Sequence, residues 1–227
     1  TYLLQQFFSP HSNRRQDSWG GSREKRTRFP IEVLTKVQHV VAEKEASPFI
    51  IGYRFSPEEI EEPGIRFEDT MFLLNTLAEY EPDYFHISAN SYQRTSIVNQ
   101  EDTEPLINKY IKMQSAQLAK IPLIGVGSIA QRQDAEHALE LGYDLLSVGK
   151  AYLVEPQWTD KISQNEEVEQ FVDIHDQKVL HIPSPLWKVM DFMILDKEEE
   201  HRKYERLKAL QNKKVKFNKG TYHVYAK

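Results

Sequence analysis

The sequence predicts an α/β fold with a parallel sheet, on the strength of two observations. Four short apolar runs with little alternation recur along the chain, at 49–56, 83–88, 121–127 and 143–149. Such runs are typical of strands buried on both faces, as in a parallel sheet. Helical patterns lie between the runs, and strand–helix alternation is typical of an α/β fold. Four strands fit either a small open sheet or half of an eight-stranded (β/α) barrel, because a complete barrel needs more strands than the chain offers.

Three helices are expected around these strands, at 27–44, 66–80 and 133–142. Pro30 fits only near the start of the first helix, because proline lacks the N–H of a helix interior. Gly142 is a natural C-terminal stop for the third helix. The apolar side chains expected to pack inward are Ile31, Val33, Leu34, Val37, Val40 and Val41 in the first helix, Phe67, Met71, Leu74, Leu77 and Ala78 in the second, and Ala135, Ala138, Leu139 and Leu141 in the third.

The chain changes character after about residue 160. Residues 165–172 and 181–195 have helical patterns, 196–216 is a charge-rich helix candidate, and a short hairpin is expected about Lys219-Gly220. We therefore expect two parts: residues 1–160 hold the strands and their helices, and residues 161–227 form a helical extension that ends in a hairpin.

The composition is that of an ordinary globular domain. Of its 227 residues, 40% are hydrophobic and 28% are charged, and the net charge of −5 gives no general attraction to nucleic acid or to anionic membranes. No apolar run reaches the ~20 residues that span a bilayer. The absence of cysteine excludes thiolate metal sites, predicts no metal centre and suits a cytoplasmic protein. The first residues lack the marks of a secretory signal, and we expect the chain to be a piece of a longer protein.

Two of the apolar runs end in glycine, at Gly125-Val126-Gly127-Ser128 and at Ser147-Val148-Gly149-Lys150. Glycine after a strand lets a ligand approach the backbone closely, and the first N–H groups of a following helix stabilise an anion. Two such ends on neighbouring parallel strands predict a phosphate site, to which Ser128 adds a hydroxyl and Lys150 a cation. The alternative is that these glycines are ordinary turn residues.

Residues 1–29, TYLLQQFFSPHSNRRQDSWGGSREKRTRF, carry a more specific pattern. It resembles the old yellow enzyme family, FMN-dependent ene-reductases that include bacterial NADH:flavin oxidoreductases. This chain has Lys25 at a position where the family usually has an Asn. The resemblance continues at GYRFS (52–56), YFHIS (84–88), IPLIGVGSI (121–129) and YDLLSVGKAYLVEPQW (143–158), so it covers about residues 1–160. The positions of the first segment that fit are Tyr2, Leu3, Leu4, Gln6, Phe7, Ser9, Pro10, Asn13, Arg15, Asp17, Trp19, Gly20, Gly21, Ser22, Arg26, Arg28 and Phe29.

The resemblance implies the C-terminal half of a TIM (β/α)₈ barrel that begins after the fourth strand. It implies FMN as cofactor, NADH or NADPH as reductant and a small-molecule substrate. The family's flavin site is shared by both barrel halves, and its substrate-binding pair precedes the segment like TYLL. The missing N-terminal half is therefore an expected partner, we expect this chain alone to be inactive, and we expect a homo-oligomer.

The resemblance also implies roles for individual residues. Tyr2 matches a tyrosine that protonates the substrate α-carbon in several members, and a phenol carries its proton at neutral pH, as that role requires. Arg54 matches an arginine beside flavin N1 and the C2 carbonyl, where a fixed cation stabilises negative charge. The pairs Gly127–Ser128 and Gly149–Lys150 match phosphate-binding positions. Lys150 departs from the usual arginine, which removes a planar guanidinium but keeps the charge.

Ser88, with Asn90, lies at a strand end where barrel sites are built, so contact with the flavin or the substrate is expected there. The predicted function is NAD(P)H-dependent hydride transfer to electron-poor alkenes through FMN. The alternatives are another phosphate-binding barrel enzyme, such as an isomerase or aldolase, and a non-catalytic half-barrel interaction module.

Overall fold

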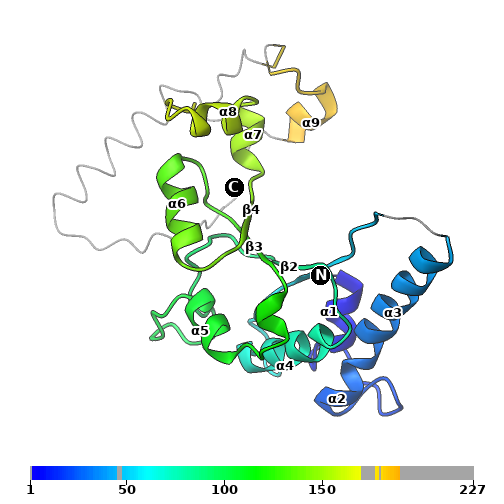
Figure 1. Cartoon of the computed structure of the whole chain (residues 1–227). Helices are drawn as coiled ribbons and strands as arrows, with labels where there is room; N and C mark the ends of the chain where they lie inside the picture. The colour runs from blue at the N-terminus through cyan, green and yellow to red at the C-terminus, as the bar shows by residue number, and fades with distance from the viewer. Residues whose placement is uncertain (1, 45–47, 170–176, 179, 190–227) are drawn as a thin grey trace. The chain divides into compact units, whose positions relative to one another are not determined.

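The computed structural model describes residues 2–44, 48–169, 177–178 and 180–189. Its sheet contains β1 (Gly52–Phe55), β2 (Tyr84–Ile87), β3 (Leu123–Val126) and β4 (Leu145–Ser147), all parallel and hydrogen-bonded in chain order (Figure 1). All four predicted strands are present, each shorter than the apolar run that predicted it. The prediction of a four-stranded parallel α/β fold is confirmed.

The chain forms two compact units. The first comprises residues 1–128 and 136–147 and contains the whole sheet, and the second comprises residues 129–135 and 148–227. The division into parts at residue 160 stays a prediction. No helix in the described ranges is both long enough and apolar enough to cross a membrane.

One face of the sheet is packed and the other is open. Tyr53, Phe55, Phe85, Ile87 and Leu123 are buried on the packed face. They belong to the same core as α4 (Phe67–Ala78), whose predicted inward residues are all buried. On the opposite face the side chains are exposed or half-buried along all four strands. Because side chains alternate along a strand, the hydrophobic residues of the core fall on one face only.

Two of the three predicted helices expose apolar residues that were expected inside. In α3 (Arg28–Glu43), Pro30 lies in the first turn and is buried with Leu34, but Val37 and Val40 are 40% and 51% exposed. In α6 (Arg132–Glu140), Ala135 and Ala138 are buried and Leu139 is 49% exposed. The inward prediction was wrong for Val37, Val40 and Leu139, because the described part of the chain leaves these faces uncovered. Gly142 ends α6 with a φ of 109°, as predicted.

The segment that carries the family pattern is an assembly of α1 (Tyr2–Phe8), α2 (Arg23–Arg26) and the start of α3. Asn13 Nδ2 donates to the carbonyls of Phe7 and Trp19, at 2.6 and 2.7 Å. Arg26 is buried and its Nε donates to the Phe8 carbonyl at 2.7 Å. Phe7 and Phe29 stack with ring centroids 3.8 Å apart. Much of the pattern therefore holds α1 in place.

Two further elements complete the first unit, the helix α5 (Leu106–Met113) and a 3₁₀ turn, η1 (Leu118–Lys120). Figure 1 shows α4 after β1 and α5 after β2, as the βα alternation requires.

The second unit contains α7 (Lys150–Val154), α8 (Trp158–Ser163) and α9 (Ser184–Val189). Trp158 is buried and its Nε1 donates to the Ala130 carbonyl at 2.7 Å. The helix predicted from residue 165 was wrong over 165–169, which have no regular structure. The helix predicted at 181–195 is confirmed over α9. Its remainder, the charged helix and the hairpin lie outside the described residues.

Candidate functional site

Arg54 lies in the middle of β1, on the open face of the sheet, with its side chain exposed. Its partner in the strand register is His86 on β2, so the two side chains stand next to each other on that face. Burial, and secondly the charge of Arg54, lower the pKa of His86, so the imidazole is neutral at pH 7. His86 Nε2 is buried without a hydrogen-bond partner in the described structure. This face therefore carries the positively charged guanidinium of Arg54 beside a neutral imidazole.

The turn after β3 is in contact with the loop that follows β2. Gly127 has a φ of 95°, and a Cβ there would lie 2.5 Å from the carbonyl carbon of Asn90. The N–H of Tyr92 donates to the Gly127 carbonyl and the hydroxyl of Ser128 donates to the Asn90 carbonyl, both at 3.0 Å. The close contact with this loop is by itself enough to require a glycine at position 127, without any ligand. The Ser128 proton is already used, so its hydroxyl can only accept a further hydrogen bond.

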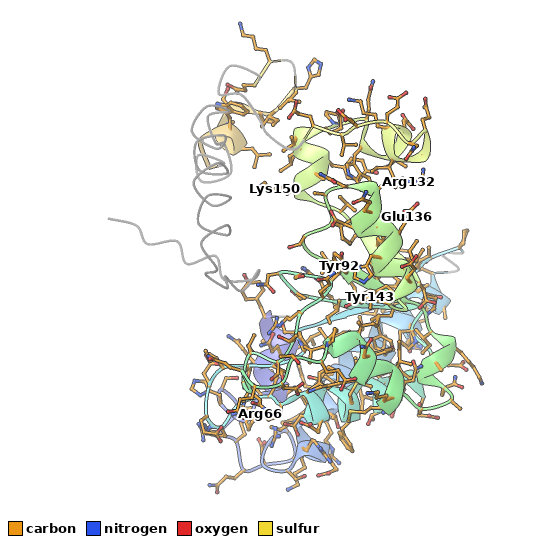
Figure 2. All side chains as sticks on the ribbon, turned by 90° about the vertical axis from the view of Figure 1, so that its left-hand side faces the viewer. Arg66, Tyr92, Arg132, Glu136, Tyr143 and Lys150 are labelled. Carbon is orange, nitrogen blue, oxygen red and sulfur yellow. The ribbon has the colours of Figure 1, made fainter. Side chains whose placement is uncertain are left out.

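Tyr92 fixes this loop from the other side. It is buried, its hydroxyl lies 3.2 Å from His137 Nδ1, and its carbonyl accepts from the Tyr143 hydroxyl at 3.0 Å. Burial raises the pKa of Tyr143 to about 12, so this donor keeps its proton at neutral pH. Tyr92 and Tyr143 lie side by side in Figure 2. The turn at Gly127 thus rests on a rigid support.

The turn after β4 belongs to the second unit and differs from the first. Gly149 has an ordinary negative φ of −116°, and a Cβ placed on it would meet nothing within 4 Å. Lys150 follows it and is exposed. The backbone is therefore open to a ligand at Gly149, where no packing demands a glycine.

The N–H groups before α6 are not free, contrary to the expectation for the start of this helix. Asp134 Oδ2 accepts hydrogen bonds from the Ala130 and Gln131 N–H groups, at 3.0 and 2.9 Å. A carboxylate already occupies the position that an anion would take there.

Tyr2 stands in the first turn of α1 and is 89% exposed. The helix that carries it is tied to the segment after β1 through Glu59. The Glu59 carboxylate accepts from Gln5 Nε2 at 2.8 Å, from Ser9 Oγ at 2.5 Å and from the Ile65 N–H at 3.1 Å. Ser9, part of the family pattern, therefore positions α1.

Ser88 is half-buried directly after β2, and its N–H donates to the Phe55 carbonyl at 2.7 Å. The structure thus brings Ser88, Gly127 and Ser128 to the carboxyl ends of neighbouring strands, and places Arg54 farther down β1. Among the described residues, no group of three or more His, Asp or Glu side chains could hold a metal ion.

Residues 1–169 match the sequence profile of the NADH:flavin oxidoreductase / NADH oxidase family. The chain belongs to this family. It is 60% identical over 227 residues to the NADH:acrylate oxidoreductase of Vibrio harveyi, which covers all of this chain and 23% of that protein. It is 50% identical over 198 residues to the NADH:fumarate oxidoreductase of Klebsiella pneumoniae, covering 86% of this chain and 21% of that protein. The chain thus spans less than a quarter of the length of these two relatives.

A Bacillus subtilis relative described as a probable NADH-dependent flavin oxidoreductase is 38% identical over 194 residues, which are 83% of this chain and 50% of that protein. Among solved structures, morphinone reductase superposes with a TM-score of 0.55 at 22% identity, over 74% of this chain and 42% of that one. The old yellow enzyme homologue of Zymomonas mobilis gives 0.57 at 16% identity, over 82% and 49%. These likenesses confirm the fold as part of the barrel of this family.

The sequence patterns did not predict roles for Glu58 and Glu59, which follow the end of β1 by three and four residues. The signal that could have found them is their place after the carboxyl end of a barrel strand, where sites are built. Apart from the Ile65 N–H, which lies six residues from Glu59, the described hydrogen-bond partners of these carboxylates lie 38 to 54 residues away in the chain, which no local pattern shows.

Proposed function

We propose that the complete protein transfers hydride from NADH to an electron-poor alkene. FMN, when bound, supplies the relay that takes hydride from NADH and passes it to the β-carbon of the alkene. One proton must also reach the α-carbon, so that NADH, the alkene and a proton give NAD⁺ and the saturated product. The observation that carries the proposal is the exposed Arg54 beside neutral His86 on the open face of the sheet, in a chain of this family.

The residues of the chain fit the cofactor at two places. Arg54 offers a fixed cation on the open face for the electron-rich edge of a flavin ring. Gly149 leaves its backbone uncovered, and Lys150 adds a point charge for a phosphate. The Gly127–Ser128 turn fits less simply, since its glycine is explained by packing and its hydroxyl proton is engaged. All five of these residues, together with Ser88, are proposed cofactor contacts.

Tyr2 is the proposed proton donor. Its exposure on α1 leaves the phenol free to meet a substrate, and α1 is fixed by Glu59, Gln5 and Ser9. The names of two relatives support an alkene as acceptor, because acrylate and fumarate are both alkenes conjugated to a carboxylate.

A second candidate function follows from the lengths of the relatives. The whole chain spans 23% of the Vibrio protein, whereas 83% of the chain spans 50% of the Bacillus protein, so the Vibrio protein is well over twice as long. In a protein of that length, this barrel could oxidise NADH and pass the electrons to a redox centre elsewhere, where the alkene is reduced. Tyr2 would then have no proton to deliver.

The two candidates are separated by Tyr2→Phe in the complete protein. Bleaching of the flavin by NADH needs no proton from Tyr2 and should be nearly unchanged. Reoxidation by an enone should slow by ~10²-fold or more, the scale for losing a positioned general acid. Stopped-flow absorbance measures each step, and a quinone, which needs no carbon protonation, serves as control acceptor. Equal enone rates in the variant and the wild type would remove Tyr2 as the acid and favour the second candidate.

A further inference from the structure

The loop between β2 and α5, residues 88–105, lies at the carboxyl end of β2 and is held by carboxylates. We propose that Glu58 is a positioning residue that holds the tip of this loop, residues 94–98, and that the tip in this position contacts the nicotinamide of NADH. The effect on NADH rests on the proposed function, whereas the contact between Glu58 and the loop does not depend on it.

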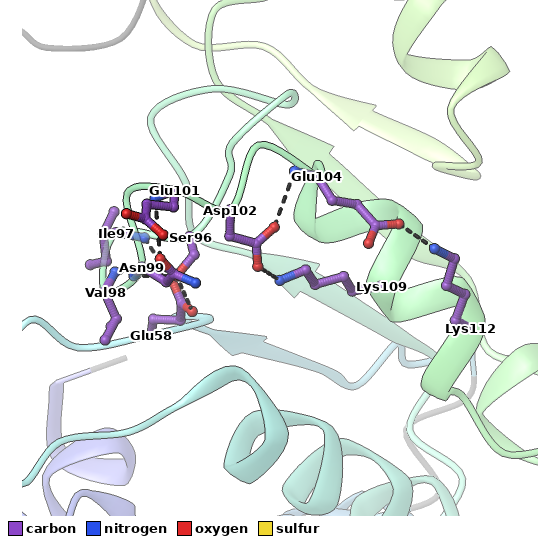
Figure 3. A network of polar contacts seen from close by, with 10 residues as sticks. All are labelled: Glu58, Ser96, Ile97, Val98, Asn99, Glu101, Asp102, Glu104, Lys109 and Lys112. Carbon is purple, nitrogen blue, oxygen red and sulfur yellow. Dashed lines mark hydrogen bonds and ion pairs between the residues drawn. The ribbon is translucent and has the colours of Figure 1, made fainter.

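The first observation is that Glu58 is buried and fully engaged with the loop. It is 7% exposed, its Oε1 accepts from Ser96 Oγ, and its Oε2 accepts from the Ile97 N–H, both at 2.9 Å. Ser96 Oγ in turn accepts from the N–H groups of Val98 and Asn99, at 3.2 and 3.0 Å. One carboxylate therefore orders four consecutive loop residues (Figure 3).

The second observation is the charge of Arg94. Its side chain is half-buried, and its Nε is buried without a hydrogen-bond partner in the described structure. Burial lowers the pKa of Arg94, and the negative charge of Glu58 opposes that shift. A partly desolvated cation is costly unless an opposite charge lies near. Without the Glu58 charge, the Arg94 side chain gains by moving into water, which removes packing from the loop tip.

The third observation is that the rest of the loop is anchored separately. Asp102 pairs with Lys109 and Glu104 pairs with Lys112, both lysines being on α5 (Figure 3). These ion pairs fix the end of the loop nearest α5. Glu58 reaches the tip from the β1 side, and the tip presents Ile97 and Val98, 38% and 39% exposed. Glu58 therefore holds Ser96 and Ile97, while the ion pairs on α5 and the hydrogen bond from the Leu106 N–H to the Arg94 carbonyl, at 2.8 Å, hold the two ends of the loop.

The experiment compares Glu58→Ala with Glu101→Ala in the complete protein. Glu101 belongs to the same loop and its side chain is exposed, so it is a matched control. Trypsin cleavage after Arg94, mapped by mass spectrometry, reports release of the tip without requiring activity. NADH affinity and the saturating rate of flavin bleaching are measured by stopped flow.

Glu58→Ala should raise the rate of cleavage at Arg94–Thr95 about tenfold and lower the affinity for NADH about tenfold. This is the scale for losing a charge-assisted hydrogen bond. The saturating rate should change much less, and Glu101→Ala should change neither readout. Cleavage as slow as in the wild type would overturn the proposal, and so would faster cleavage with unaltered NADH affinity.

Glu58→Gln keeps the shape of the side chain and removes only the charge that faces Arg94. Its cleavage rate and NADH affinity should lie between those of wild type and Glu58→Ala, and wild-type values for both would overturn the role of the charge. This variant carries the test if Glu58→Ala does not fold. A wild-type protein that holds no FMN would refute the proposed function, and the cleavage comparison would still decide whether Glu58 holds the loop.

Discussion

Gly127 and Gly149 end two similar sequence motifs, yet they are glycines for different reasons. At Gly127 the φ is positive and the backbone of Asn90 occupies the space of a Cβ, so the fold itself excludes any other residue. At Gly149 the φ is ordinary and a Cβ would meet nothing within 4 Å. Packing therefore explains the glycine at 127, whereas close approach of a ligand is the remaining explanation for the glycine at 149.

Substitution at Gly149 should separate cofactor binding from folding. Gly149→Val should weaken FMN by at least ~10-fold, because branched methyl groups would block a phosphate at the backbone, with little change in melting temperature. Gly127→Val should destabilise the protein by ~1–3 kcal/mol or more from backbone strain, whether or not FMN binds. Lys150→Ala should weaken FMN less than Gly149→Val, since the backbone N–H groups remain. Fluorescence titration of FMN and thermal melting measure the two effects. Wild-type FMN affinity in Gly149→Val would remove the phosphate assignment at this turn.

The helix α1 carries the proposed acid but depends on another segment for its position. Glu59 accepts hydrogen bonds from two α1-side residues, Gln5 and Ser9, and from the Ile65 N–H of its own loop. Stacking of Phe7 on Phe29 and the bonds of Asn13 and Arg26 hold the rest of the segment. The geometry at Tyr2 should therefore respond to changes at Glu59.

Glu59→Ala should loosen α1 and lower stability by ~1–3 kcal/mol, because three donors lose a partly buried acceptor. Hydrogen exchange of the amides of residues 4–9 should accelerate. If Tyr2 is the proton donor, enone reoxidation should slow while flavin bleaching by NADH is retained. The exposed neighbour Glu61, changed to Ala, is the control. Unchanged exchange in α1 would show that other contacts hold the helix.

The elements that the sequence predicted well are those with a continuous apolar run or a periodic apolar face that is buried. The apolar runs predicted the strands, and the apolar face of α4, whose predicted inward residues are all buried, predicted that helix. Val37, Val40 and Leu139 follow the same helical spacing and are exposed, because spacing gives a face but not what covers it. Arg54 and Tyr2 were found only through the family pattern. Glu58 and Arg94 were missed, because burial and charge pairing between two loops have no periodic signal.

At the scale of the whole molecule, the sheet of the first unit has two edge strands and one exposed face. Among the described residues, β1 and β4 each pair with a strand on one side only. The face that carries Arg54 is exposed, and so are Leu145 on β4 at 53% and Val40 on α3 at 51%. Sheet edges and apolar faces of this kind favour association with other strands. In a barrel the preceding strands and helices would cover them.

The 227-residue chain, produced by itself, should therefore self-associate or require the N-terminal half of the barrel, and should hold FMN weakly or not at all. Among the residues of the four described strands, Arg54 is the one cation on the open face, and the side of the flavin turned toward the other strands of a barrel would stay in water. Adding the N-terminal half as a separate polypeptide should reduce the self-association, since it covers the same edges, and should restore FMN binding. Light scattering and FMN fluorescence measure the two effects on one sample. A stable monomer with one tightly bound FMN would show that the four strands suffice for the site, and that the exposed faces are compatible with a solitary chain.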